Sequence, residues 1–341
     1  MRLTIYASRK QKEQTKKEDG MKGTFKVIGI VALIVCVGLM FTSPGLSKVK
    51  RLRIATAGIG GTWYPLGGGV AKVITKYING VEATAYPSGA SVENIRAVSK
   101  KRADLALVMP DAAYYAYKGT GMFKGKKVAN IRGVCSTYPI DVEVIVAADS
   151  PIKKFEDIKG HSIACGAPGS GIELMTRRLL KVHNMSYDDV KENFLSVSES
   201  MQAFKDGTVD VIITSIGTPS SAIMDLVTKR KIRFLDISDA ALEKINKILP
   251  VYFRHIIPGG TYKGIDKDCK TIAWMGFFIT YAEMDDKLVY SILDAIFSHK
   301  PELNEIHAKF KLITLKTATN GISIPLHPGA EKFFKDKGII K

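Results

Sequence analysis

Hydroxyl side chains and glycines occur together in four short turns of this sequence, each at the point where an apolar strand pattern gives way to a helical one. The turns contain Gly61-Thr62, Ser88 with Ser91, Gly169-Ser170-Gly171, and Thr218-Pro219. The start of a helix leaves backbone N–H groups without partners, and a neighbouring hydroxyl adds a further hydrogen-bonding group. Such groups are suited to holding a carboxylate or another anion. The residue types therefore favour an anion-binding site built from backbone and hydroxyl groups.

Three other side chains near these turns are candidate ligand contacts: Tyr64, Asn94 and Asp111. Tyr64 and its neighbour Trp63 could form the floor of a pocket or belong to the core. Asn94 could bond a ligand or face water, and Asp111 could be an ordinary helix cap. A single Ser or Thr turn before a helix is usually only a cap. Four such turns at strand ends favour a ligand cleft.

None of the four turns contains Arg or Lys, and Arg96 and Arg177 lie further along the predicted helices. We expect both arginines to be solvated. The ligand is then held chiefly by hydroxyls and helix-start N–H groups, and not by one dominant arginine.

The motifs of several enzyme classes are missing from the sequence. Gly58-x-Gly60 continues to Trp63 where a dinucleotide-binding turn needs a third glycine. No Walker A, Gly-x-Ser-x-Gly or His-Glu-x-x-His pattern occurs, and the six histidines lack the spacing of metal ligands. We therefore expect no catalytic residue, no metal and no cofactor, although a Ser-His-Asp triad assembled in space stays open.

The elements that must position these turns form a repeat. Short apolar runs alternate with helical patterns, which predicts βαβ units and a largely parallel sheet. Both halves follow the order strand, glycine-rich turn, helix, strand, helix, strand. The predicted strands of the two halves are 51–57, 81–86 and 104–109, then 161–166, 193–197 and 210–215. Ligands bind beyond the carboxyl ends of such strands, so the turns should face a crevice between two lobes.

Two long strand patterns, 141–148 and 271–281, connect the halves and predict a two-strand hinge. We assign 48–148 to the first part of lobe 1 and 149–272 to lobe 2. Residues 273–341 then return to lobe 1 and include a long helical pattern over 285–310. The predicted fold class is α/β, with two α/β lobes.

The length of 341 residues favours two domains, and 46% hydrophobic and 24% charged residues are typical of a globular chain. The formal net charge of +17 raises the possibility of nucleic-acid binding. The basic residues are scattered, however, and no zinc-ligand spacing or basic–aromatic stripe occurs. We therefore expect no nucleic-acid partner.

The N-terminal region has the order of a secretory signal: basic residues, an apolar run over 27–41, and small residues near Gly45 and Ser47. We predict that residues 1–47 are a signal peptide and that the mature protein is periplasmic. Met21 could be the true start, which would make 1–20 an over-called extension. A membrane anchor is the alternative, but the apolar run is short for a bilayer span.

Removal of the signal leaves Cys135, Cys165 and Cys269. An odd number of cysteines in an oxidising compartment leaves at least one unpaired. Cys165 lies in an apolar strand pattern and is expected to act as a small buried hydrophobe. A bridge between Cys135 and Cys269 stays open.

The turns also carry a family resemblance. Five segments resemble the motifs of TAXI-type receptors, the extracytoplasmic solute-binding subunits of one class of TRAP transporters: 58–69 (GIGGTWYPLGGG), 88–95 (SGASVENI), 104–114 (DLALVMPDAAY), 166–173 (GAPGSGIE) and 217–220 (GTPS). The resemblance covers about 50–335, and the order of the motifs is more specific than any one of them. One departure is Thr214-Ser215-Ile216-Gly217, where members often carry an aromatic residue followed by small ones.

The resemblance implies a type II periplasmic-binding-protein fold and a TRAP-type membrane permease as partner. It also implies a small carboxylate ligand such as glutamate, glutamine or a 2-oxoglutarate-like acid. A periplasmic enzyme on the same scaffold and a ligand-sensing regulatory domain are the alternatives. The enzyme would need a nucleophile or base with a partner, and the regulator would need a DNA-binding or signalling module.

Overall fold

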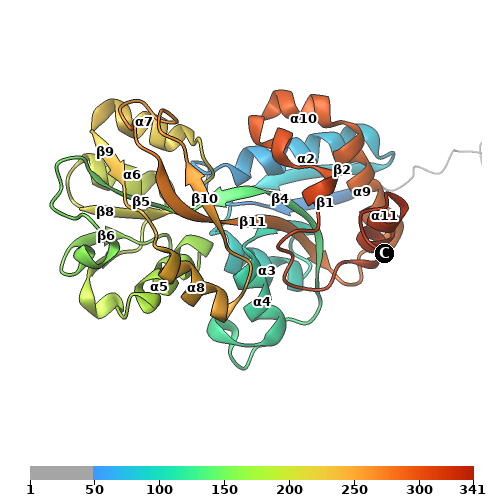
Figure 1. Ribbon diagram of the computed structural model, residues 1–341. Coiled ribbons are helices and arrows are strands. Elements are labelled where there is room, and N and C mark those ends of the chain that lie inside the picture. The colour runs from blue at the N-terminus through green and yellow to red at the C-terminus, as the bar shows by residue number, and fades with distance from the viewer. Residues whose placement is uncertain (1–48) are drawn as a thin grey trace, which may run out of the picture. The chain divides into compact units, whose positions relative to one another are not determined.

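Two β-sheets organise residues 49–341, which are the part of the chain that the computed structural model describes (Figure 1). The predicted signal peptide, 1–47, lies outside the described residues. Among the helices of 49–341, none has the length and apolar character needed to cross a bilayer.

The first sheet has the strand order β10-β11-β3-β1-β2, and β4 pairs with the same strand β11. Strand β1, which lies between β2 and β3, is parallel to both, whereas β11 runs antiparallel to β3, β4 and β10. The strands are β1 (Lys50–Ala55), β2 (Val81–Tyr86), β3 (Leu105–Val108), β4 (Ile131–Asp141), β10 (Phe253–Ile257) and β11 (Cys269–Tyr281).

The second sheet has the order β7-β6-β8-β5-β9. Its strand β6 is parallel to both β7 and β8, and β5 runs antiparallel to β8 and β9. The strands are β5 (Glu143–Ala147), β6 (Ser162–Ala164), β7 (Lys191–Asn193), β8 (Val211–Thr214) and β9 (Ile232–Phe234).

The repeat predicted from the sequence is present in both sheets. The unit β1-α2-β2-α3-β3 in the first sheet corresponds to β6-α5-β7-α6-β8 in the second, and each unit places its first strand between the other two. The fold class of two α/β lobes is therefore confirmed. The helices that follow the parallel strands are α2 (Trp63–Tyr77), α3 (Ser91–Ser99), α4 (Pro110–Lys118), α5 (Gly171–Val182), α6 (Val197–Lys205) and α7 (Ser221–Lys229).

Helix α2 carries three consecutive glycines, which weaken a helix in isolation. Two of them allow close packing: a Cβ atom on Gly67 would overlap the side-chain methyl of Thr56, which follows β1, and one on Gly69 would overlap the Phe310 ring. Gly67 thus lets α2 lie directly against its own sheet.

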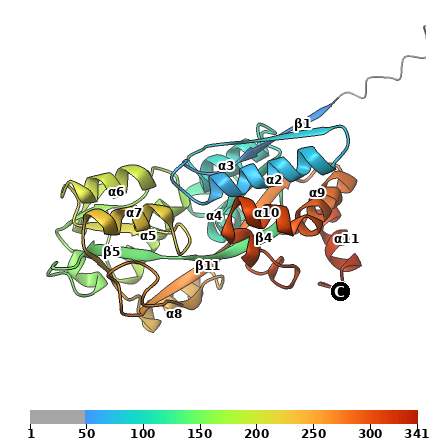
Figure 2. The same ribbon diagram turned by 90° about the horizontal axis from the view of Figure 1, so that it is seen from above.

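The chain passes between the sheets at Val142, where β4 ends and β5 begins, and β4 lies beside β11 there (Figure 2). The sequence-based boundaries assigned two strands differently. The boundary at residue 148 places β5 in lobe 1, whereas β5 pairs with β8 from Glu143 onward and belongs to the second sheet. β10 falls within 149–272, yet it pairs with β11 in the first sheet. Both pairings are antiparallel; β8 is far from β5 in sequence, whereas β11 is the strand that follows β10.

The C-terminal region covers the first sheet with helices. The helical pattern predicted over 285–310 is interrupted near His299, because Pro301 stands at the start of a new helix and cannot donate an intrahelical hydrogen bond. The remaining helices are α8 (Asp239–Ile248), α9 (Asp286–Ser298), α10 (Lys300–Ile306) and α11 (Pro328–Asp336). The three described cysteines, Cys135, Cys165 and Cys269, are buried free thiols, so Cys135 and Cys269 do not pair.

Candidate ligand-binding site

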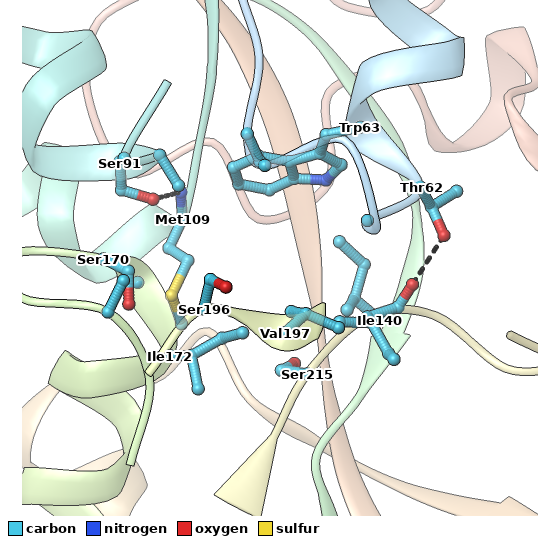
Figure 3. Close-up of a pocket in the computed structure, with 18 of the residues that line it drawn as sticks. Thr62, Trp63, Ser91, Met109, Ile140, Ser170, Ile172, Ser196, Val197 and Ser215 are labelled. Carbon is cyan, nitrogen blue, oxygen red and sulfur yellow. Dashed lines mark hydrogen bonds between the residues drawn. The ribbon is translucent and has the colours of Figure 1, made fainter. Parts of the chain in front are cut away.

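A cavity of about 220 Å³ lies where the turns of the two lobes meet (Figure 3). It is lined from the first lobe by the turns after β1 and β2, and from the second lobe by the turns after β6 and β7. Of the residues that the sequence predicted for the site, the following line it: Gly61, Thr62, Ser88, Ser91, Ser170 and Gly171.

Four helices begin at the cavity. The lining residues Trp63, Ser91, Gly171 and Val197 are the first residues of α2, α3, α5 and α6. The first N–H groups of a helix have no intrahelical partner, and the helix dipole makes this end partly positive. The four helix starts therefore give the cavity a surplus of hydrogen-bond donors and a positive potential.

Three serine hydroxyls lie at these helix starts. Ser91 Oγ accepts a hydrogen bond from the N–H of Met109 at 3.0 Å. Ser170 Oγ accepts from the Glu173 N–H at 3.1 Å, and Ser196 Oγ accepts from the Glu199 N–H at 3.4 Å. The O–H groups of Ser91 and Ser170 have no acceptor among the described residues, whereas the Ser196 hydroxyl also hydrogen-bonds the Glu199 carboxylate. Figure 3 shows these three serines with Met109 among the lining residues.

The rest of the cavity is largely apolar. Trp63 and Trp274 meet edge to face with their ring centroids 6.0 Å apart. Trp274 Nε1 donates to Ser215 Oγ at 2.9 Å, which fixes the indole against the cavity. Further apolar side chains in the lining are Met109, Ile140, Ile172, Val197 and Ile216.

Several lining residues are not among those predicted from the sequence. Ser196 begins a capping box with Glu199, a pattern that could have identified it. Ser215 was noted only as a departure from the resemblance, and Tyr138 and Trp274 were not considered. These last two lie within the strands β4 and β11, where no turn pattern marks them.

The lobes contact one another beside the cavity. Thr62 Oγ1, from the first lobe, donates to the Ile216 backbone carbonyl of the second lobe at 2.7 Å. Thr62 therefore contributes to the contact between the lobes as well as to the lining.

Two predicted ligand contacts, Asn94 and Asp111, instead form hydrogen bonds and an ion pair within the fold. The Asn94 side chain donates to the carbonyls of Thr56 and Leu107, each at 2.7 Å, and accepts from Ser88 Oγ at 2.6 Å. Asp111 is fully buried and pairs with Arg178 at 2.6 Å. Neither residue lines the cavity.

Four more predicted residues also lie outside the lining: Tyr64, Gly169, Thr218 and Pro219. The Tyr64 side chain is exposed to solvent. Thr218 Oγ1 donates to Glu143 Oε1 at 2.9 Å, so this hydroxyl contacts the crossing between the sheets and not the cavity. Gly169 has a φ of +71°, a conformation that glycine adopts without strain, and it shapes the turn before Ser170.

A buried polar cluster lies behind the cavity at the crossing between the sheets. Burial raises the pKa of Glu143 well above its ordinary value, because a charged carboxylate would lose its hydration there. Asp141 Oδ1 lies 2.5 Å from His255 Nδ1, and this contact raises the pKa of His255. The ammonium of Lys309 donates to the Thr218 carbonyl.

No charged side chain lines the cavity in residues 49–341. The same range contains no group of three or more His, Cys, Asp and Glu placed to hold a metal ion. The exposed Arg177 pairs with the buried carboxylate of Glu173 on α5, and Arg96 lies over the Phe123 ring. The site can therefore bind by hydrogen bonds, the helix potential and apolar contact.

Fold and cavity together define a two-lobed α/β protein with a candidate binding site between the lobes. Residues 54–338 match the model of the NMT1-like family. The chain belongs to this family.

Similarity to individual proteins is more distant. A protein of Escherichia coli (strain K12), described as binding aliphatic sulfonates, is 33% identical over 78 residues, which are 23% of this chain and 24% of that relative. The match thus spans about a quarter of the relative's length.

Solved structures share the fold at low identity. A structure from Bordetella bronchiseptica RB50 aligns with a TM-score of 0.51 and 16% identity, over 85% of this chain and 89% of that one. The alkanesulfonate-binding protein of Xanthomonas axonopodis pv. citri, solved with MOPS, aligns with a TM-score of 0.47 and 16% identity, over 84% and 90% of the two chains.

Proposed function

We propose that this protein is a periplasmic solute-binding receptor that encloses a small carboxylate between its lobes and performs no chemical step on it. The observation that carries the proposal is the meeting of four helix starts, with the donor hydroxyls of Ser91 and Ser170, at one cavity between the lobes. Helix N-termini attract anions. A ligand that contacts both lobes also shifts the protein from open to closed arrangements.

The finer part of the proposal is that the protein is a TAXI-type receptor, and it rests on the five ordered sequence motifs. In this assignment the ligand is glutamate, glutamine or a 2-oxoglutarate-like acid. The partner is a TRAP-type membrane permease driven by an ion gradient. The short match to a protein described as binding aliphatic sulfonates adds another class of small anion to the candidates.

Binding without a chemical step is favoured over an enzyme by the composition of the lining. Within 49–341 it contains no His, Cys, Lys, Asp or Glu, so no side chain there is an obvious base. Incubation of purified protein with candidate ligands, followed by NMR, should show no turnover.

The test begins with mass spectrometry of small molecules released from purified protein, which should identify a bound anion. Small-angle scattering of protein emptied by partial unfolding should then show a smaller radius of gyration after that anion is added back. Unchanged scattering, with emptiness of the starting protein verified, would contradict the receptor mechanism.

Transport and export need their own measurements. Uptake of the recovered anion by vesicles that contain the permease should depend on an ion gradient and not on ATP; ATP-driven uptake would exclude a TRAP-type partner.

Amino-terminal sequencing of periplasmic material should give a start near Lys48, and a start well before Gly45 would exclude the predicted cleavage.

A further inference from the structure

The balance of donors and acceptors around the cavity restricts the ligand further than the proposed function does. We infer that the ligand is a small anion with an apolar body and no ammonium group. This inference rests on the proposed receptor function and identifies the class of solute. It separates oxo acids and simple sulfonates from the amino acids that share their carbon skeletons.

Donors are gathered at one part of the cavity. Ser91 and Ser170 each direct a free O–H there, beside the first N–H groups of α3 and α5. The two helix starts are close together, since a Cβ atom on Gly171 would lie 2.9 Å from Ser91 Oγ. An anionic head group at this place would be held from both lobes.

Three backbone carbonyls at or near the cavity already accept hydrogen bonds from side chains. Asn94 donates to the carbonyls of Thr56 and Leu107, two residues outside the lining. Thr62 donates to the carbonyl of the lining residue Ile216 on the other lobe. These contacts reduce the number of free acceptors that an ammonium group could use.

The carboxylates nearest the helix starts also have hydrogen-bond or ion-pair partners within the protein. Glu93, Glu173 and Glu199 occupy corresponding places in the first turns of α3, α5 and α6. Glu93 accepts from the Gly89 N–H at 2.8 Å, and Glu199 accepts from the Ser196 N–H at 2.8 Å. Glu173 lies 2.6 Å from the guanidinium of Arg177. None of the three lines the cavity.

The buried acids behind the cavity offer no free negative charge. Asp111 is paired with Arg178, and Asp141 is paired with His255. Burial raises the pKa of Glu143 and so favours its uncharged form, and its Oε1 accepts from Thr218. An ammonium group in the cavity would therefore be a buried cation without a counter-charge.

An unpaired buried charge is strongly unfavourable, which sets the expected discrimination. A ligand with an ammonium group should bind at least roughly a hundredfold more weakly than its analogue without one.

The body of the ligand is expected to contact the apolar side chains Trp63, Trp274 and Ile140. The cavity volume of about 220 Å³ favours a small molecule as ligand.

The experiment measures calorimetric affinities for three matched pairs on the emptied protein: 4-methyl-2-oxopentanoate with L-leucine, 2-oxoglutarate with L-glutamate, and ethanesulfonate with taurine. Members of a pair share a skeleton and differ at the ammonium group. The member without it should bind at least a hundredfold more tightly in the pair that binds best. The tightest pair also distinguishes a carboxylate from a sulfonate head group.

A variant tests the electrostatic reason. Ser196→Asp keeps an effective helix-capping residue and adds a carboxylate to the lining. It should weaken binding of the oxo acid or sulfonate at least tenfold. The ratio of affinities between the two members of a pair should fall by a similar factor. Ser238→Asp is the matched control, because Ser238 caps α8 with its side chain and lies outside the cavity. It should leave both affinities unchanged.

The outcomes separate this inference from the proposed function. An amino acid that binds as tightly as its oxo analogue, with compaction in solution, overturns the inference and leaves the receptor function standing. Absence of binding by every anion tested, and of any co-purifying anion, overturns both. If Ser196→Asp weakens both members of a pair equally, the charge argument is wrong.

Discussion

The guanidinium of Arg178 lies 2.6 Å from the carboxylate of Asp111, although the two residues belong to helices of different lobes. Both side chains are almost completely buried, with 3% and 0% exposure. Tyr252 donates to the same Asp111 carboxylate at 2.8 Å, and Arg178 donates to the hydroxyl of Tyr115 at 2.9 Å. This satisfied ion pair ties α5 to α4 beside the ligand cavity.

Loss of one partner should be costly because the other charge would remain buried. We expect Asp111→Asn to lower the free energy of unfolding by about 3–5 kcal/mol, measured by urea denaturation. Ligand affinity should fall as well, since the pair joins the lobes. The double variant Asp111→Leu/Arg178→Met should recover most of the stability.

An ion pair exposed on both sides provides the control for this buried pair. Arg51 Nε lies 3.3 Å from Glu82, and the two side chains are 82% and 53% exposed. Arg51→Met should therefore change stability by less than about 1 kcal/mol. Equal effects of Asp111→Asn and Arg51→Met would show that the buried pair has no special role.

Ser170 is expected to contact the anion directly. Removal of a hydrogen bond to a charged group costs about 1.5–3 kcal/mol, so Ser170→Ala should weaken binding by roughly ten- to a hundredfold in calorimetry. Ser238→Ala removes a comparable cap from α8 and should lower the melting temperature without changing affinity. If Arg96→Ala or Arg177→Ala abolishes binding while Ser170→Ala does not, a side-chain salt bridge holds the ligand.

Gly171 lies where the lobes approach each other. An added Cβ would lie 2.6 Å from Met109 Cγ, on the opposite lobe. Gly171→Ala should therefore hinder closure and reduce ligand affinity at least roughly tenfold, while the ligand-free protein stays as stable, because Ala is a better helix former than Gly. Gly68→Ala, where the new Cβ meets no atom within 4 Å, should leave affinity unchanged. Wild-type affinity in Gly171→Ala would mean that the lobes do not close this tightly on the ligand.

Glu143 should make the protein less stable as the pH rises. Burial raises its pKa in the folded state, whereas the carboxyl in the unfolded chain titrates near 4.5. Between these two values the folded state binds more protons than the unfolded state, so the free energy of unfolding falls with increasing pH. The loss is about 1.4 kcal/mol for each pH unit in this window.

Glu143→Gln should remove this loss and raise stability at pH 7, measured by urea denaturation between pH 5 and 8. The exposed Glu243→Gln is the matched control and should follow the wild-type curve. A Glu143→Gln curve parallel to that of the wild type would show that Glu143 is ionised in the folded protein.

Local patterns in the sequence determined the repeated unit and part of the site. The alternation of apolar runs and helical patterns predicted β1-α2-β2-α3-β3 and its counterpart β6-α5-β7-α6-β8. The glycine and hydroxyl turns at Thr62, Ser91 and Ser170 predicted residues that line the cavity. These features depend on neighbours within a few positions, and such neighbours are visible in the sequence.

Only the tertiary structure decided which distant residues meet. Asp111 and Arg178 form a buried pair, and Thr218 turns to Glu143 instead of the cavity, because the packing of separate elements brings those partners together. Trp274 reaches the cavity from the middle of β11, where the strand pattern shows burial but not what the side chain faces. The pairing of β5 with β8 depends likewise on long-range strand contacts, whose energies no local pattern records. β10 joins the first sheet through the neighbouring strand β11, whose other partners β3 and β4 are distant in sequence.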